Sequence, residues 1–303
     1  MTAMTGDDLF SLALDTFAQS WATFGIPDKV RAPGYDHELG LKICSLMYEK
    51  GGRDDAAYGR ALRDFMLLSE EFVKLQMELD RVGHYRYSSF DEVRAAVYDN
   101  PDYMDGQYLN GLFLSQAFWL NHTKMYAYFV ERFCTGNPPG GTVFEVPSGT
   151  GFFIAEFARR NPGWTATGID LSDSSVAFSR AMSELNGNGG VTIAKQDVFT
   201  LPDDAAYDRI ICGELLEHLE DPEALLGKLT KLIAPGGRLF VTTAIWAASI
   251  DHIYLYESAR DVREMLDRYF VIDSELALNL KDGKGPEDEK TPINYACVLV
   301  PKS

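Results

Sequence analysis

Four residues between positions 149 and 197 have the types and spacing to hold a nucleoside. Gly149 and Gly151 form a Gly-x-Gly turn, which lets the backbone approach a ligand closely. Asp170 follows about twenty residues later, where a carboxylate suits hydrogen bonding to two ribose hydroxyls; alternatively it only caps the next helix. Asp197 is placed to accept from the exocyclic amine of adenine, or is an ordinary loop acid. Together they favour a nucleoside site.

A second group could act as acid or base. Glu214, Glu217 and His218 are spaced to share one face of a helical turn, so Glu214 and His218 are candidate catalytic residues. His252 is a further candidate, with Asp251 beside it to orient the ring or to bind a substrate amine. Each histidine has a structural alternative, as a packed or ordinary loop residue. The pattern leaves the choice of base open.

The elements that position these residues alternate between strands and helices. Strands are expected near Val143–Val146, Trp164–Ile169, Val191–Ala194, Arg209–Cys212, Arg238–Thr243, Val271–Leu276 and Tyr295–Val300. Helices are expected near Gly151–Arg160, Asp173–Leu185, Pro222–Ile233 and Ser258–Tyr269. This rhythm predicts an α/β, Rossmann-like doubly wound sheet, mostly parallel, with an antiparallel last strand after a hairpin. Such sheets bind ligands beyond the carboxyl ends of their strands.

The chain before Gly141 shows helical periodicity instead. An amphipathic helix is expected from Leu9 to Phe24, and others over Asp36–Lys50 and Asp55–Arg81. Tyr103–Cys134 is apolar on several faces and predicts a buried helix, interrupted at Gly106 and Gly111. The Gly- and Pro-rich stretch 135–141 then marks a boundary. Two domains are therefore predicted, helical over residues 1–138 and α/β over residues 139–303.

Composition limits the partners. A formal charge of −17 and a pI near 4.7 disfavour nucleic acid and an anionic membrane surface, since both repel an acidic protein. The four cysteines are scattered without a metal-binding motif, so no bound metal is expected. Scattered cysteines also predict a reducing, cytoplasmic location. The N-terminus lacks the features of a secretory signal, and no apolar run is long enough to span a membrane. Exchange of the first helix between subunits would give a homo-oligomer.

Several motifs, taken in order, resemble one family. They are Glu145-Val-Pro-Ser-Gly-Thr-Gly151, Gly168-Ile-Asp-Leu-Ser172, Gln196-Asp197, Leu215-Leu-Glu-His-Leu-Glu-Asp-Pro222 and Pro235-Gly-Gly-Arg-Leu-Phe-Val241. This set looks like the class I S-adenosylmethionine-dependent methyltransferases, over roughly residues 141–303. The resemblance implies S-adenosylmethionine as cofactor.

The resemblance also implies roles for individual residues. The glycine turn would hold the methionine half of the cofactor, Asp170 the ribose, and Asp197 would face the adenine. The full predicted cofactor set is Glu145, Pro147, Ser148, Gly149, Gly151, Asp170, Leu171, Asp197, Val198 and Glu214. Pro147 departs from the family, which usually has glycine there. Proline restricts φ and has no N–H, so the departure is tolerated drift or a sign that the methionine half is held unusually.

The helical first part resembles the variable lid that such enzymes place over the substrate. Aromatic faces attract a sulfonium cation, although most aromatic residues here belong to the core. Polar atoms on an apolar helix need partners, which singles out Tyr108, Asn121 and His122. The predicted substrate and lid residues are Tyr108, Trp119, Asn121, His122, Tyr126 and Trp246.

These observations predict a methyltransferase acting on a small molecule, in secondary metabolism. Three alternatives stay open. One is an enzyme of this fold whose cofactor amine attacks its own γ-carbon, giving azetidine-2-carboxylate and methylthioadenosine; Pro147 is the sequence feature that suggests it. Another is a nicotinamide dehydrogenase, although Ile154 stands where its fingerprint has glycine or alanine. The last is a non-catalytic binding protein.

Overall fold

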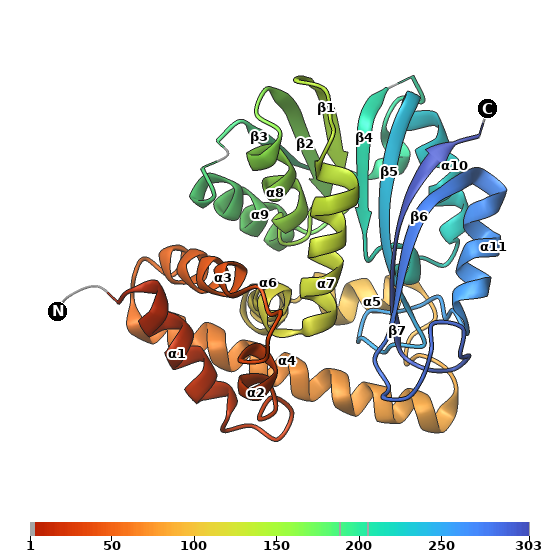
Figure 1. Ribbon diagram of the computed structural model, residues 1–303. Coiled ribbons are helices and arrows are strands. Elements are labelled where there is room, and N and C mark those ends of the chain that lie inside the picture. Colours follow the sequence, from red (N-terminus) through yellow and green to blue (C-terminus); the bar gives the residue numbers. More distant parts are fainter. Residues whose placement is uncertain (1–3, 188, 205, 303) are drawn as a thin grey trace.

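The computed structural model describes residues 4–187, 189–204 and 206–302, and its centre is a seven-stranded sheet (Figure 1). The strand order is β3-β2-β1-β4-β5-β7-β6. Their bounds are β1 Gly141–Glu145, β2 Trp164–Asp170, β3 Val191–Lys195, β4 Tyr207–Gly213, β5 Ile233–Ile245, β6 Phe270–Asn279 and β7 Ile293–Pro301. β7 is antiparallel to β5 and β6, whereas β1 to β5 pair in parallel. The predicted Rossmann-like α/β fold with an antiparallel last strand is confirmed.

Alternating side chains bury the two faces of this sheet in different cores. Val143 and Phe240 face a cluster shared with α8 (Phe152–Arg160), while their neighbours Phe144 and Leu239 face the cluster under α10 (Pro222–Leu232) and α11 (Ala259–Tyr269). This follows from the two-residue period of a strand. Because both faces are covered, the strands are apolar on both sides, and their polar residues come at the ends.

Side-chain caps begin two of the helices that follow strands. The Ser172 side chain accepts from Ser175 N at the start of α9 (Asp173–Leu185), and Asp221 accepts from Ala224 N before α10. Such caps satisfy N–H groups that would otherwise lack partners. They leave the strand ends and the following turns at one edge of the sheet, where the site lies.

Helices that precede β1 lie across this same edge (Figure 1). Their bounds are α1 Gly6–Phe17, α2 Ile26–Val30, α3 His37–Lys50, α4 Asp55–Val82, α5 Phe90–Val93, α6 Leu109–Phe118 and α7 Leu120–Phe129, with π-helical turns η1 Arg94–Tyr98, η2 Tyr103–Tyr108 and η3 Val130–Cys134. Phe129 and Phe133 pack on Phe240 of β5, with ring centroids 4.9 and 5.7 Å away. One hydrophobic cluster thus joins both parts of the chain. The predicted division at residue 138 stays a prediction.

Two helix predictions need correction. The first helix ends at Phe17 instead of continuing to Phe24, and Phe24 is 67% exposed. In the apolar segment the helix breaks at Trp119, which has an extended backbone, and not at Gly111. Gly111 lies within α6. A Cβ at this position would come within 2.6 Å of Leu68 Cδ2 in α4, so the missing side chain lets the two helices pack closely. α1 packs on α3 and α4 of its own chain, and its exchange between subunits stays a prediction.

Candidate active site

One cavity of about 900 Å³ lies between the helical part and the carboxyl edge of the sheet. The turns after β1, β2, β3 and β4 line one side of it, and residues of α4, α6 and α7 line the other. This is the place that the doubly wound topology predicts for a ligand. Most of the predicted cofactor residues meet here: Glu145, Pro147, Ser148, Gly149, Asp170, Leu171, Asp197, Val198 and Glu214 all line the cavity.

The turn after β1 is held by backbone hydrogen bonds. Ser148 N donates to Ile169 O at 2.8 Å, and Gly149 N donates to Asp170 Oδ2 at 2.9 Å. Gly149 has a φ of +47°, and a Cβ there would meet nothing within 4 Å. Gly149 therefore presents open backbone to the cavity, as a turn that cradles a ligand requires.

Gly151 has a different role from the predicted one. It does not line the cavity; its φ is +72°, and a Cβ there would lie 2.7 Å from Ser179 Cβ on α9. Gly151 thus lets α8 begin in close contact with α9. Its glycine preference comes from backbone conformation and packing.

Replacing Gly151 by Ala is expected to lower the free energy of unfolding by about 2–4 kcal/mol, because a left-handed non-glycine residue costs about 1–3 kcal/mol and overpacking adds to it. Urea denaturation would measure this. Gly59→Ala, inside α4 with only Arg63 Nη1 near a new Cβ, is the control and should stabilise. Equal stability of Gly151→Ala and the wild type would contradict the packing role.

Asp170 ends β2 with a buried carboxylate. Its Oδ1 accepts from Ser172 N at 2.9 Å, while Oδ2 accepts from Gly149 N. Burial raises the pKa of Asp170, although these backbone hydrogen bonds oppose the rise. Asp170 therefore holds the turns after β1 and β2 and also lines the cavity, and its contact with a ribose stays a prediction. Asp197 likewise accepts from Phe199 N at 2.9 Å and lines the cavity.

Glu145 and Glu214 carry oxygens without partners. Glu145 Oε2 and Glu214 Oε1 are buried and accept no hydrogen bond from the residues that the structure describes. Burial raises the pKa of both side chains. Glu214 also has a φ of +47°, a strained conformation for a residue with a side chain. Unsatisfied acceptors at the cavity wall fit a cationic ligand, and with the open Gly149 turn they fit S-adenosylmethionine.

Asp251 lies behind the cavity wall, which argues against binding a substrate amine, while the other predicted role, orienting the ring of His252, stays a prediction. It is fully buried and accepts from Tyr98 Oη at 3.0 Å, from Ser249 Oγ at 2.5 Å and from Tyr108 Oη. Burial favours the neutral acid, but His218 and these hydrogen bonds outweigh it and lower the pKa of Asp251. Asp251 thus joins two tyrosines of the helical part to the loop after β5.

His218 and His252 both line the cavity, on the η5 turn (Leu216–His218) and the loop after β5. Their rings lie 4.9 Å apart, nearly perpendicular. His252 Nδ1 lies 2.8 Å from Ala247 O, and burial lowers the pKa of His252 to about 3. His252 is therefore neutral at physiological pH and a poor general base, contrary to the prediction.

Four of the predicted lid residues reach the cavity: Tyr108, Trp119, Asn121 and His122. Asn121 Nδ2 donates to Asn294 Oδ1 at 2.6 Å, and burial lowers the pKa of His122 to about 4. Trp246 does not line the cavity, since it packs with Leu79 and Tyr85. Sequence reasoning missed Tyr98 and Asn294, which also line the cavity; no sequence signal links Tyr98 to Asp251, 153 positions away.

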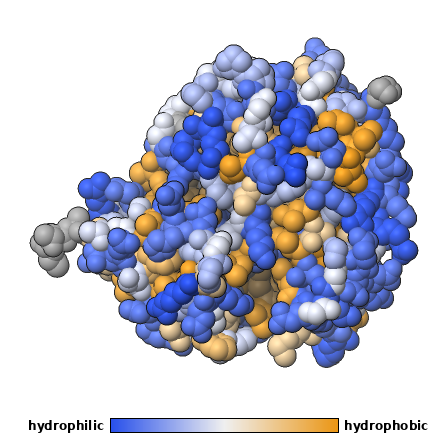
Figure 2. All heavy atoms as spheres, in the orientation of Figure 1, coloured by the Kyte–Doolittle hydropathy of each residue, from blue (hydrophilic) through white to orange (hydrophobic). Residues whose placement is uncertain are grey.

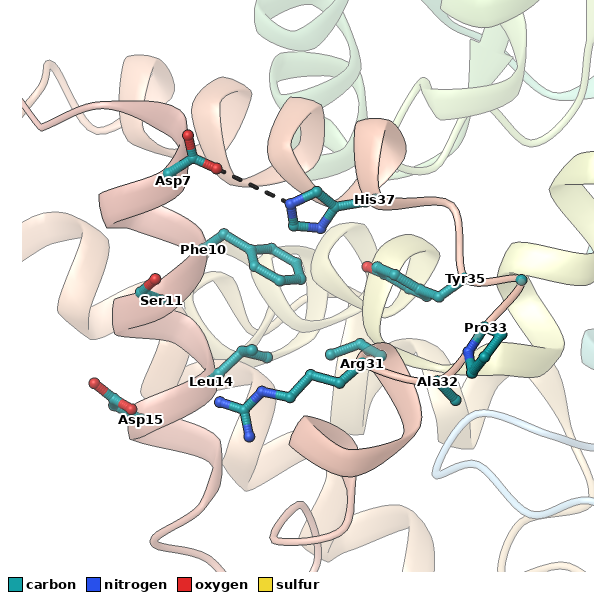
Figure 3. A pocket seen from close by; sticks show the side chains of 12 residues that line it. Asp7, Phe10, Ser11, Leu14, Asp15, Arg31, Ala32, Pro33, Tyr35 and His37 are labelled. Carbon is teal, nitrogen blue, oxygen red and sulfur yellow. Dashed lines mark ion pairs between the residues drawn. The ribbon is translucent and has the colours of Figure 1, made fainter.

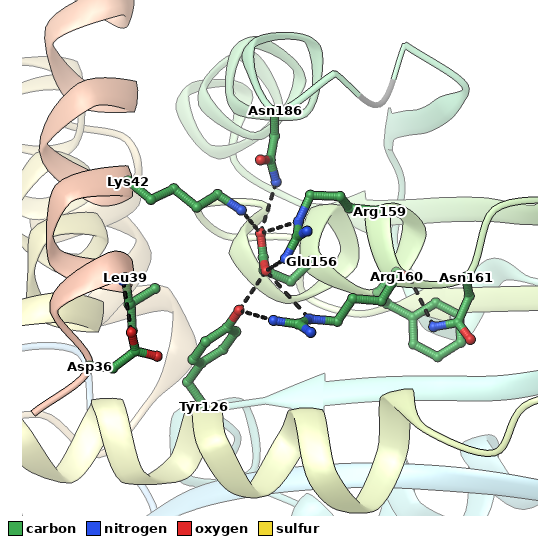
Figure 4. Close-up of polar contacts among 10 residues, drawn as sticks. Asp36, Leu39, Lys42, Tyr126, Glu156, Arg159, Arg160, Asn161 and Asn186 are labelled. Carbon is green, nitrogen blue, oxygen red and sulfur yellow. Dashed lines mark hydrogen bonds and ion pairs between the residues drawn. The ribbon is translucent and has the colours of Figure 1, made fainter. Parts of the chain in front are cut away.

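Tyr126 also lies outside the cavity and instead binds Glu156, a fully buried carboxylate of α8 (Figure 4). Tyr126 Oη donates to Glu156 Oε2 at 2.6 Å, and Arg159 Nη2 donates to the same oxygen at 2.9 Å. Lys42 of α3 and Asn186 hold the other oxygen. Burial alone would raise the pKa of Glu156, but these partners lower it to about 2. The network joins α3 and α7 to the sheet.

A second depression of about 700 Å³ lies between α1 and the segment joining α2 to α3 (Figure 3). Asp7 and His37 face each other at its rim, 4.0 Å apart and largely exposed. None of the predicted site residues lines it. Elsewhere the face in Figure 2 is mostly hydrophilic, with hydrophobic residues emerging between the helical part and the sheet. Within the described residues, no helix is long and apolar enough to cross a membrane.

Comparison with known proteins identifies a domain in the middle of the chain. The model of the methyltransferase domain family matches residues 144–239, which contain the glycine turn, Asp170, Asp197 and Glu214. Residues 144–239 therefore carry a methyltransferase domain, which agrees with the resemblance to the class I S-adenosylmethionine-dependent methyltransferases. The predicted resemblance is confirmed, and S-adenosylmethionine is the cofactor. This decides against the nicotinamide alternative.

Individual relatives are more distant. A ubiquinone biosynthesis O-methyltransferase of Coxiella burnetii (strain Dugway 5J108-111) is 34% identical over 105 residues, 34% of this chain and 44% of that protein. An uncharacterised protein of Synechococcus is 30% identical over 160 residues, 50% of this chain and 35% of its own length. The chain thus spans less than half the length of these curated relatives. A methyltransferase solved with the Haloferax volcanii Trm112 methyltransferase activator shares the fold, with a TM-score of 0.51, 17% identity, and coverage of 68% of this chain and 98% of its own.

Proposed function

We propose that the protein transfers the methyl group of S-adenosylmethionine to a small molecule held between the helical part and the sheet. One observation carries the proposal: the same cavity is lined by the glycine turn with Asp170 and by lid residues such as Trp119 and Asn121. A cofactor on the turn would therefore face an acceptor under the lid. The name of the Coxiella burnetii relative supports methyl transfer.

The lining of the lid side supports a largely apolar acceptor. It combines hydrophobic side chains with a few amides: Phe72, Leu109, Leu112, Trp119, Leu219, Gln76, Gln116 and Asn121. Pockets of this size and mixture bury most of the surface of a small organic ligand, and the amides orient it. The formal charge of −17 further disfavours nucleic acid as acceptor.

The cofactor supplies a methyl group on a sulfonium, which an acceptor displaces in line. The chain's own contribution is alignment and the exclusion of water, which can account for much of the acceleration of such a reaction. Tyr98 and Tyr108 keep the helical part closed over the cavity through Asp251. His218, on the cavity wall, is the remaining candidate base for an acceptor that must lose a proton.

A role in secondary metabolism and a cytoplasmic location belong to the same proposal. The four cysteines support the location, since all are free and buried.

Incubation with S-adenosylmethionine, alone and with a panel of phenols, amines and carboxylic acids, tests the reaction. We expect S-adenosylhomocysteine to form only with an acceptor, as measured by mass spectrometry of the small products. The Asp170→Asn variant is the control and should form much less. Methylthioadenosine and azetidine-2-carboxylate formed without any acceptor would contradict methyl transfer and establish the intramolecular reaction.

A further inference from the structure

Three buried side chains, two of them on the cavity wall, bring potential metal ligands together. Glu217, His218 and His252 each offer one ligand atom, and these atoms all lie within 4.8 Å of one another. Glu217 and His218 come from the η5 turn after β4, and His252 from the loop after β5. The fold thus assembles a two-histidine, one-carboxylate set that has no compact sequence motif.

Both imidazole rings are oriented as metal ligands usually are. His252 Nδ1 lies 2.8 Å from Ala247 O, and His218 Nδ1 lies 3.0 Å from Asp251 O. A carbonyl oxygen can only accept, so Nδ1 of each ring carries the proton and donates it there. Nε2 of each ring is then left with a free lone pair. Metal-binding histidines typically donate their other N–H to a carbonyl or carboxylate in this way.

The carboxylates are held with spare lone pairs. Thr243 Oγ1 donates to Glu217 Oε2 at 2.6 Å, and Ala244 N donates to Glu217 Oε1 at 3.1 Å. Each oxygen of an ionised carboxylate accepts about two bonds, so Glu217 can still coordinate an ion. Glu214 lies in contact with Glu217, and its buried Oε1 has no partner among the described residues.

Charge points to a cation. Glu214 and Glu217 lie close together in the interior, and no lysine or arginine in the described part of the chain pairs with either, whereas Asp251 beside them pairs with His218 Nδ1 at 3.3 Å. Buried carboxylates are costly unless a positive charge compensates them. A divalent cation at the shared centre of these side chains would do so.

We propose that Glu217, His218 and His252 bind one divalent transition-metal ion. Imidazole and carboxylate without thiolate suit Mn²⁺, Fe²⁺ or Zn²⁺. Metal–nitrogen bonds are about 2.1 Å long, so the ligand atoms would close in by a few tenths of an ångström or more. Because His218 and His252 line the cavity, the open coordination positions would face the acceptor. The site goes beyond the proposed methyl transfer and does not depend on it.

Titration of the chelator-treated protein with Co²⁺, Mn²⁺, Zn²⁺ and Mg²⁺, without cofactor, tests the site. We expect calorimetry to show one transition-metal ion per chain with micromolar or tighter affinity and weaker binding of Mg²⁺. Co²⁺ should give a visible spectrum of nitrogen and oxygen ligands. Glu217→Gln and His252→Asn should each weaken metal binding more than about 100-fold. Removing a residue that only hydrogen-bonds to a ligand already weakens metal affinity about 10- to 100-fold. His37→Asn, at the distant exposed rim, is the matched control and should bind normally.

A measurement on the wild type alone guards against variants that fail to fold. Substoichiometric Mn²⁺ should broaden the NMR ring signals of His218 and His252 while those of His37 and His84 stay sharp. Absence of stoichiometric binding, uniform broadening, or unchanged affinity in folded Glu217→Gln and His252→Asn would overturn the proposal and leave these side chains as a hydrogen-bonded network. Calorimetry with S-adenosylmethionine on the same sample tests the cofactor site separately.

Discussion

Replacing Asp170 by Asn is expected to weaken the binding of S-adenosylmethionine about 10- to 100-fold. The predicted contact is from the carboxylate to the ribose hydroxyls, and a hydrogen bond to a charged group contributes about 1.5–3 kcal/mol. Asp170 also accepts from Gly149 N and Ser172 N, so the amide of the variant would disturb the turn that cradles the cofactor. Isothermal titration calorimetry measures the loss directly.

The matched control is Asp173→Asn, three residues along the chain at the exposed start of α9. Its side chain is 82% exposed and pairs with Lys195, so its loss should leave cofactor affinity unchanged. Thermal unfolding of both variants separates a local loss from a global one. If folded Asp170→Asn bound the cofactor as tightly as the wild type, Asp170 would only hold the turns after β1 and β2.

Replacing Glu156 by Gln is expected to lower the free energy of unfolding by about 3–5 kcal/mol. Removing one partner of a buried ion network leaves the others without compensation, which has a cost of this order. In Glu156→Gln, Lys42 and Arg159 would lose the negative charge that compensates them, and Tyr126 would lose its charged acceptor (Figure 4). Because the network joins α3 and α7 to α8, we also expect the lid to loosen. Denaturant unfolding measures the stability, and hydrogen exchange in α3 and α7 measures the loosening.

The pH dependence of this effect has a definite sign. The pKa of Glu156 is lowered to about 2 from an ordinary value of 4.5. A carboxyl whose pKa is lower in the folded state stabilises the fold fully above the unfolded pKa and loses that contribution as pH falls. The stability difference between the wild type and Glu156→Gln should therefore shrink as pH falls from about 4.5 towards 2.

Glu223→Gln is the control for Glu156, because Glu223 also binds an arginine and a tyrosine, Arg268 and Tyr269, but at the surface. An exposed ion pair contributes little, so this variant should unfold almost as the wild type does. Equal stabilities of Glu156→Gln and Glu223→Gln would show that the buried network does not hold the lid.

Much of the fold could be predicted because its causes are local. Val143 and Phe144 face opposite cores since successive strand residues point to opposite faces, and this period is visible in the sequence. Helix caps are also local, so Ser172 can be predicted from the sequence as the residue that begins α9. The break at Trp119 could not be predicted, because Gly111 was a more probable interruption until its contact with Leu68 was known. That contact joins two helices far apart in the chain.

The sequence by itself determined the fold class, the resemblance to methyltransferases and the edge of the sheet where a cofactor would bind, because glycines and acids at strand ends keep their spacing in any doubly wound sheet. Only the tertiary structure decided which of these residues reach the cavity. Gly151 allows α8 to pack closely on α9, Tyr126 binds Glu156, and Asp251 binds two tyrosines of the helical part. Each of these partners is distant in sequence. Tertiary structure likewise brought His252 beside Glu217, because burial and hydrogen bonding at that point depend on elements that meet only after folding.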